Sequence, residues 1–146
     1  MSGTRPSAAP AAELAHQALN AGLWTEAIQY SIAAGNEAMD LFAVPVAITH
    51  YETAWQLAEQ QGWLQALSGA DRQALYASLG RAYELAEAWQ QAQQTYQAMI
   101  AYAREVSAPA IECLGLNSLS TVYINGLKDP QQAITILKQA RAVAEE

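Results

Sequence analysis

Apolar and polar residues are spaced along most of the chain as on the faces of α-helices, and glycine and proline divide the pattern into segments. Gly22, Gly62 and Gly126 mark helix ends, whereas Pro45 and Pro109 fall in first turns, where a missing N–H is tolerated. A loop at residues 63–70 has room for one helical turn. The pattern predicts seven helices, at about residues 11–21, 25–42, 45–61, 72–87, 89–106, 109–125 and 130–146.

Residue composition and helix caps favour the same all-α interpretation. Alanine, leucine and glutamine are good helix formers, and a single phenylalanine with few valine or isoleucine runs leaves little from which to build strands. Thr25, Asp71 and Asp129 stand where N-caps are needed, and Asp129 is followed by proline. At 146 residues the chain fits one domain, either a helical bundle or a stack of helical hairpins.

An internal repeat decides between these two architectures in favour of the stack. The pattern is a small residue, an aromatic or alanine three positions later, then an alanine, then a large residue four positions later. A small residue lets the first helix of a hairpin approach the second, where an alanine faces the gap, while aromatic residues fill the space between hairpins. The repeated sets are Gly35, Ala38, Ala47 and Tyr51; Gly80, Tyr83, Ala92 and Tyr96; and Ser120, Tyr123, Ala133 and Leu137.

These positions resemble the signature of the tetratricopeptide repeat family. The resemblance covers repeats at about residues 28–62, 73–107 and 113–146, with a degenerate half-repeat at 11–27 and a flexible linker at 1–10. It implies a right-handed superhelical stack of antiparallel hairpins over residues 11–146. Repeat starts near residues 28, 73 and 113 are 45 and 40 residues apart, longer than the family's 34.

The same resemblance implies a partner-binding groove lined by the first helix of each hairpin. The matching positions are Gln29, Ile32, Asn36, Met39 and Asp40; Ala74, Ala77, Arg81, Glu84 and Leu85; and Leu114, Asn117, Thr121, Ile124 and Asn125. Apolar residues mixed with amides and a few charges are typical of a surface that binds a peptide or helix. Trp63, in the predicted loop, is equally well read as an interface anchor or as a packing residue.

A narrower resemblance concerns the run from Ala27 to Ala43 and the run from Ala47 to Ala54. Both are similar to the helical arm of large bacterial ATP-dependent signalling regulators. This implies a protein–protein interaction scaffold that is a regulatory arm of a longer polypeptide. The alternative is a sensor domain that binds a small ligand or peptide in its concave groove.

Charge and reactive residues narrow the function classes further. Residues 1–71 hold one basic and seven acidic residues, so a nucleic-acid or anionic-membrane surface is not expected. His16, His50 and Cys113 show no ligand spacing or nucleophile pattern, and no glycine motif for nucleotides is present. We therefore expect no catalytic residues, metal or cofactor, and a cytoplasmic protein that binds a protein, a peptide or neighbouring domains.

The last predicted helix carries an apolar stripe of Ile134, Leu137, Ala140 and Val143. Solenoids need polar caps on their terminal repeats. An uncovered stripe predicts a further repeat, a partner domain or a homodimer formed through this helix.

Overall fold

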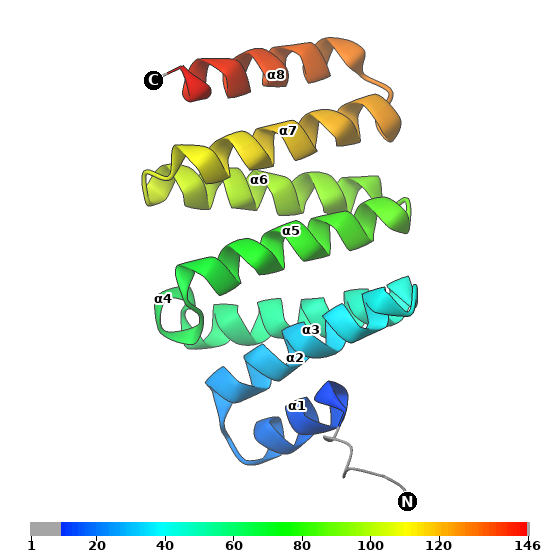
Figure 1. Ribbon diagram of the computed structural model, residues 1–146, viewed down its shortest axis with the longest axis vertical. Coiled ribbons are helices and arrows are strands. Elements are labelled where there is room, and N and C mark those ends of the chain that lie inside the picture. Colours follow the sequence, from blue (N-terminus) through cyan, green and yellow to red (C-terminus); the bar gives the residue numbers. More distant parts are fainter. Residues whose placement is uncertain (1–9, 146) are drawn as a thin grey trace, which may run out of the picture. The chain divides into compact units, whose positions relative to one another are not determined.

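The computed structural model describes residues 10–145, and its regular elements are all helices (Figure 1). Within that range there are eight helices and no strand, which confirms the all-α prediction. The additional helix is a single turn inside the predicted 63–70 loop. None of the helices is long and apolar enough to cross a membrane. The predicted linker at residues 1–10 lies, apart from Pro10, outside the described residues.

The chain divides into two compact units, with the boundary between Ser68 and Gly69. The first unit contains α1 (Ala11–Asn20), α2 (Trp24–Asp40), α3 (Val44–Gln61) and the short α4 (Trp63–Ala66). Both α1 and α3 pack against α2. Because many of the facing residues are alanines, the helices approach closely, and Ile28 and Tyr51 are almost completely buried among them.

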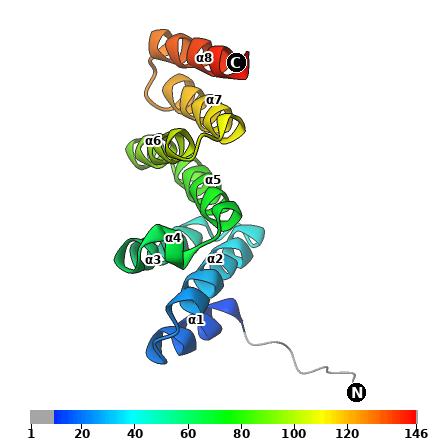
Figure 2. The same cartoon turned by 90° about the vertical axis from the view of Figure 1, so that its left-hand side faces the viewer.

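The second unit contains α5 (Gly69–Leu85), α6 (Trp89–Glu105), α7 (Pro109–Asn125) and α8 (Pro130–Ala144). Each helix packs antiparallel to the next one along the chain (Figure 1). In Figure 2, α6 is offset from α5 and α7, which also touch each other. The unit is therefore a series of consecutive helical hairpins.

Helix ends agree with the sequence except at two predicted caps. Asp129 is an N-cap as expected, because its Oδ1 accepts a hydrogen bond of 3.1 Å from the backbone N–H of Gln132. In contrast, α5 begins at Gly69, so Asp71 lies in its first turn, where a negative charge still favours the helix dipole. Thr25 likewise lies inside α2, which begins at Trp24.

A 20-residue period links helix length to turn geometry. Helices α2, α5, α6 and α7 are each 17 residues long, and the first three are followed by three-residue turns. In these turns the second residue has a positive φ and the third donates a hydrogen bond of 2.8 Å to a carbonyl five residues earlier, which is the Schellman arrangement. The positive-φ residues are Phe42, Glu87 and Ser107, none of them glycine.

This period explains the unusual spacing of the repeats. Two helices with their turns occupy 40 residues, as in the step from α5 to α7, because each helix is longer than in a 34-residue repeat. The step from α2 to α5 is 45 residues because α3 has one extra residue and α4 is inserted after it. The tetratricopeptide relationship itself stays a prediction.

The glycines of the repeat pattern lie beneath tyrosine rings. A Cβ atom on Gly35 would lie 2.4 Å from Cε1 of Tyr51, and a Cβ on Gly80 would lie 2.4 Å from Cε1 of Tyr96. A tyrosine ring therefore closes on the glycine within each hairpin, and Ala47 and Ala92, the alanines of the repeat pattern, are fully buried. Tyrosine contacts also cross from one hairpin to the next, because the Tyr123 hydroxyl on α7 accepts a hydrogen bond of 2.7 Å from Nε2 of Gln93 on α6.

The third copy of the pattern departs from the other two. Ser120 is buried, but Leu137, which replaces the tyrosine, is 41% exposed and does not close the hairpin. Ile134 is also exposed, as expected for an open stripe on α8. Ala140, however, is buried against α7, where the Cys113 thiol donates a hydrogen bond of 3.4 Å to the Ala140 carbonyl. The open part of the stripe is therefore narrower than predicted.

Replacing Gly80 with alanine tests the glycine–tyrosine contact. We expect Gly80→Ala to lower the free energy of unfolding by roughly 1–3 kcal/mol, because the buried Tyr96 ring must move to admit the new Cβ. Chemical denaturation of single and double variants measures the effect. In a Tyr96→Leu background, Gly80→Ala should lower the free energy of unfolding much less than it does in the wild type. A stabilising Gly80→Ala, as helix propensity alone would give, would show that the ring is elsewhere.

The turn at Phe42 gives a second stability test. Phe42 has a φ of 56° and an exposed side chain, so Phe42→Gly should raise the free energy of unfolding by about 0.5–1 kcal/mol through relief of the left-handed strain. Leu41→Gly is the matched control. Because Leu41 has a φ of −95°, which any residue adopts, this variant should have a lower free energy of unfolding than the wild type. Equal losses from both variants in thermal denaturation would contradict the turn geometry.

Candidate functional site

The residues predicted to line a groove lie on α2, α5 and α7. Those on α2 belong to the first unit, and those on α5 and α7 belong to the second. Their side chains are exposed or half-buried. Within the second unit α5 and α7 are in contact, so their residues share a region of one unit. That all these positions form one groove stays a prediction.

Two of these predicted groove residues, Asn36 and Glu84, accept hydrogen bonds from tyrosines inside the hairpins. The Tyr51 hydroxyl donates a hydrogen bond of 2.6 Å to Oδ1 of Asn36, and the Tyr96 hydroxyl donates a short one to Oε2 of Glu84. Each bond therefore joins the second helix of a hairpin to the first, on the rim of the tyrosine–glycine contact. A partner that used either polar group would compete with a hydrogen bond inside the hairpin.

The burial of the ring and the hydrogen bond to Glu84 change the pKa of the Tyr96 phenol. Burial, followed by the hydrogen bond and negative charge of Glu84, raises the pKa of the Tyr96 phenol far above its ordinary value. The pKa of Tyr76 is also raised, chiefly by burial, although Arg72 donates a 2.9 Å hydrogen bond that opposes the shift. Both phenols are thus held in their neutral form, in which the Tyr96 hydroxyl donates to Glu84 and the Tyr76 hydroxyl accepts from Arg72.

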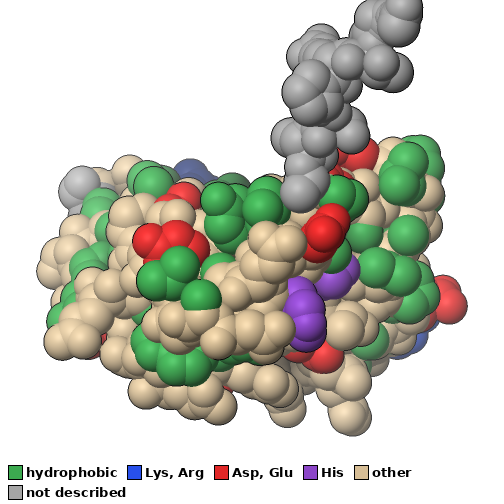
Figure 3. Space-filling view, turned by 90° about the horizontal axis from the view of Figure 1, so that it is seen from below, with side chains coloured by type: hydrophobic (Ala, Val, Ile, Leu, Met, Phe, Trp, Pro, Cys, Tyr) green, Lys and Arg blue, Asp and Glu red, His purple; other side chains and the backbone are tan. Residues whose placement is uncertain are grey.

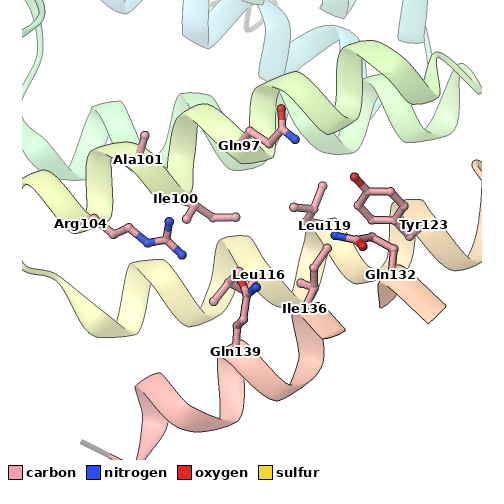
Figure 4. Close-up of a pocket in the computed structure, with 10 residues that line it drawn as sticks. All are labelled: Gln97, Ile100, Ala101, Arg104, Leu116, Leu119, Tyr123, Gln132, Ile136 and Gln139. Atoms are coloured by element: carbon pink, nitrogen blue, oxygen red, sulfur yellow. The ribbon is translucent and has the colours of Figure 1, made fainter. Parts of the chain in front are cut away.

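A pocket of about 250 Å³ lies between α6, α7 and α8 (Figure 4). Its apolar floor consists of buried side chains: Ile100, Leu116, Leu119 and Ile136. Its rim is mostly polar, and the rim residues are Gln97, Ala101, Arg104, Tyr123, Gln132 and Gln139. The pocket therefore offers apolar contact below and hydrogen-bonding groups above.

The rim of this pocket has no unbalanced charge, and three of its side-chain amides are available for hydrogen bonds. The Arg104 guanidinium is paired with the Glu112 carboxylate at 2.8 Å, so its charge is balanced. Among the described residues, the side-chain amides of Gln97, Gln132 and Gln139 make no hydrogen bond. An amide can donate and accept at once, which matches the two polar groups of a peptide unit.

Sequence reasoning missed this pocket because it assigned binding to the first helix of each hairpin. Here two of the three walls, α6 and α8, are second helices. The available signal was the run of exposed glutamines on those helices. Their positions relative to the floor required the packing of α6 and α8 around α7, which no local pattern shows.

An exposed apolar segment occupies the turn between α2 and α3. From Leu41 to Val46 the chain has no polar side chain, and Leu41, Phe42, Pro45 and Val46 are exposed, Phe42 to 88%. Residues 10–68 contain six acidic and no basic residues, so this segment lies on an acidic unit. Exposed large apolar side chains of this kind are frequent anchors of protein interfaces.

Trp63 has at least the packing role of the two that were considered for it. Its ring is half-buried and meets that of Trp55 edge to face, with centroids 5.3 Å apart and planes at 89°. Packing against α3 thus accounts for part of the side chain. Use of the remainder as an interface anchor stays a prediction.

Histidine, cysteine and acidic side chains are the residues from which a metal site could be built. In the part of the chain that the structure describes, no group of three or more His, Cys, Asp or Glu residues could hold a metal ion. The histidines do come together, because His16 on α1 and His50 on α3 line one pocket beside α2. Sequence reasoning treated them as separate.

Comparison with known proteins gives no family assignment. No protein-family model matches the chain, and no curated protein or solved structure shows significant similarity to it.

The raised pKa of Tyr96 predicts a loss of stability in alkali. An unfolded tyrosine ionises near pH 10, whereas the folded Tyr96 stays neutral, so above about pH 10 deprotonation favours the unfolded chain. Urea unfolding should show that the free energy of unfolding is lower at pH 10.5 than at pH 8. This decrease should be smaller in Tyr96→Phe than in the wild type. Tyr76 should preserve part of the drop in that variant. An identical drop in wild type and variant would contradict the assignment.

Proposed function

We propose that this chain is a non-catalytic protein-interaction module whose second unit binds a peptide segment in the pocket between α6, α7 and α8. The observation that carries the proposal is the pairing of an apolar floor with three unengaged amides on its rim. A pocket of about 250 Å³ can take one or two apolar side chains. The amides can then hydrogen-bond to the main chain beside them.

The charge of the site supports a peptide over other ligand classes. The rim carries one cation, which is already paired, so a polyanion finds no cationic surface to neutralise it. An uncharged peptide with an apolar anchor loses little solvation on entering. The exposed segment from Leu41 to Val46 supplies a second apolar contact surface on the other unit.

The proposal also includes a wider setting, which the resemblances in sequence support. The partner is a protein, or a neighbouring domain of a longer bacterial signalling regulator of which this chain is the tetratricopeptide-like arm. It acts in the cytoplasm as a scaffold, and self-association through α8 is one form of the interaction. The residues predicted on α2, α5 and α7 are the alternative contact surface.

A blocking substitution tests the peptide site. Peptides selected from a random display library against the full chain should carry an apolar anchor residue. Their affinity, measured by isothermal titration, should fall at least tenfold in Ala101→Trp, because Ala101 is an exposed rim residue and tryptophan would fill the opening. Ala110→Trp is the matched control: Ala110 is exposed on the same unit but outside the pocket, and binding should be unchanged.

The same experiment separates the two candidate surfaces. If binding survives Ala101→Trp but is lost in Asn117→Trp, the peptide occupies the predicted face of α7 instead. Failure of both selected and scrambled peptides to bind above background would contradict the proposed function.

A further inference from the structure

A second pocket, in the first unit, is unlike the peptide site. It lies between α1, α2 and α3 and has a volume of about 170 Å³. Ala15, Leu19 and Leu57 supply apolar surface, and the two histidines and Ser31 supply polar atoms. Figure 3 shows the histidine side chains gathered at one place on the molecular surface. No charged side chain is among the described residues that line it.

Ser31 is the unusual member of this pocket. Three polar side chains are buried among the described residues: Ser31, Thr95 and Ser120. The Thr95 hydroxyl donates to the Gln91 carbonyl at 2.8 Å and the Ser120 hydroxyl donates to the Asn117 carbonyl at 2.7 Å, as helix hydroxyls commonly do. Ser31 is only 3% exposed, yet its hydroxyl makes no hydrogen bond with any described residue.

A buried hydroxyl without a partner is destabilising unless something else satisfies it. Ser31 lines the pocket, so a molecule in the pocket can reach it. His50, half-buried on α3, likewise makes no hydrogen bond with a described residue and offers a second polar group to the same pocket. His16 on α1 is already close to Asn20, with 3.2 Å between His16 Nε2 and Asn20 Nδ2.

We propose that this pocket binds a small uncharged molecule with an apolar body and one hydrogen-bonding group, such as an aromatic alcohol. The polar group would meet Ser31 and His50, and the apolar body would lie against Ala15, Leu19 and Leu57. An apolar cavity of about 150 Å³ is large enough for benzene, so a single ring fits. The acidic residues of the first unit, with no basic residue between positions 10 and 68, disfavour an anion.

Phenol is the probe, and the two histidine rings are the reporters. Because the chain has two histidines, its imidazole Cε1–H region contains two NMR signals, which His16→Asn assigns. Titrating phenol into the full chain at constant pH should shift the His50 signal with saturation. Benzoate, which has the same ring and a negative charge, should bind at least tenfold more weakly.

Ser31→Ala separates a ligand site from a structural serine. Losing one hydrogen bond should weaken phenol binding about threefold to tenfold. The melting temperature should stay unchanged or rise, since the variant removes an unsatisfied buried hydroxyl. Ser120→Ala, the matched control, should lower the melting temperature because its hydroxyl is bonded, and it should leave phenol binding intact.

Several outcomes would overturn the inference. One is a phenol response that is absent, does not saturate, or is equal in wild type and Ser31→Ala. Another is a response of both ring signals to stoichiometric Zn²⁺ but not to phenol, which would make the pocket a metal site. Benzoate binding as tightly as phenol would overturn the uncharged ligand class. None of these results depends on peptide binding in the second unit.

Discussion

The contact of a tyrosine ring with a glycine backbone is the constraint on which each complete hairpin depends. At Gly35 and at Gly80 the first helix carries no side chain, so the ring of Tyr51 or Tyr96 on the second helix can lie directly over it. The ring excludes water from the gap, and its hydroxyl reaches across to Asn36 or Glu84 on the first helix. Removing the ring would leave a cavity and an unpaired polar group together.

The three-residue turns after α2, α5 and α6 are a second constraint on the hairpins. The repeated Schellman turns place a residue in the left-handed region and return the chain antiparallel after 17 helical residues. Phe42, Glu87 and Ser107 hold this conformation without being glycine, so the backbone geometry is imposed by the packing of the flanking helices. The turn sequences themselves give little sign of it.

Sequence reasoning reached the fold because its signals are local. Helix formers, glycine stops, first-turn prolines and the Asp129 cap lie within a few residues of the features that they specify. It did not predict that the Tyr96 ring lies over Gly80, since that contact depends on the rotation of α6 about its axis. It also placed Leu137 in a packing position that the structure leaves exposed, because similarity of spacing does not carry the missing aromatic ring.

The candidate sites were harder to predict than the fold because each is assembled from three helices. The glutamines on the rim of the peptide pocket come from both α6 and α8. His16 and His50 line one pocket because α1 and α3 both pack against α2. The sequence analysis did not single out Ser31, whose hydroxyl has no partner among the described residues of the folded chain. Long-range packing, rather than residue type, creates both pockets.

Mapping backbone amide NMR shifts on the ¹⁵N-labelled full chain, as a selected peptide is added to saturation, tests the proposed function most directly. The account predicts that the largest changes cluster on α6, α7 and α8 around Ala101, Gln132 and Gln139. Changes confined to α2 and α5, or scattered weakly over both units, would contradict it.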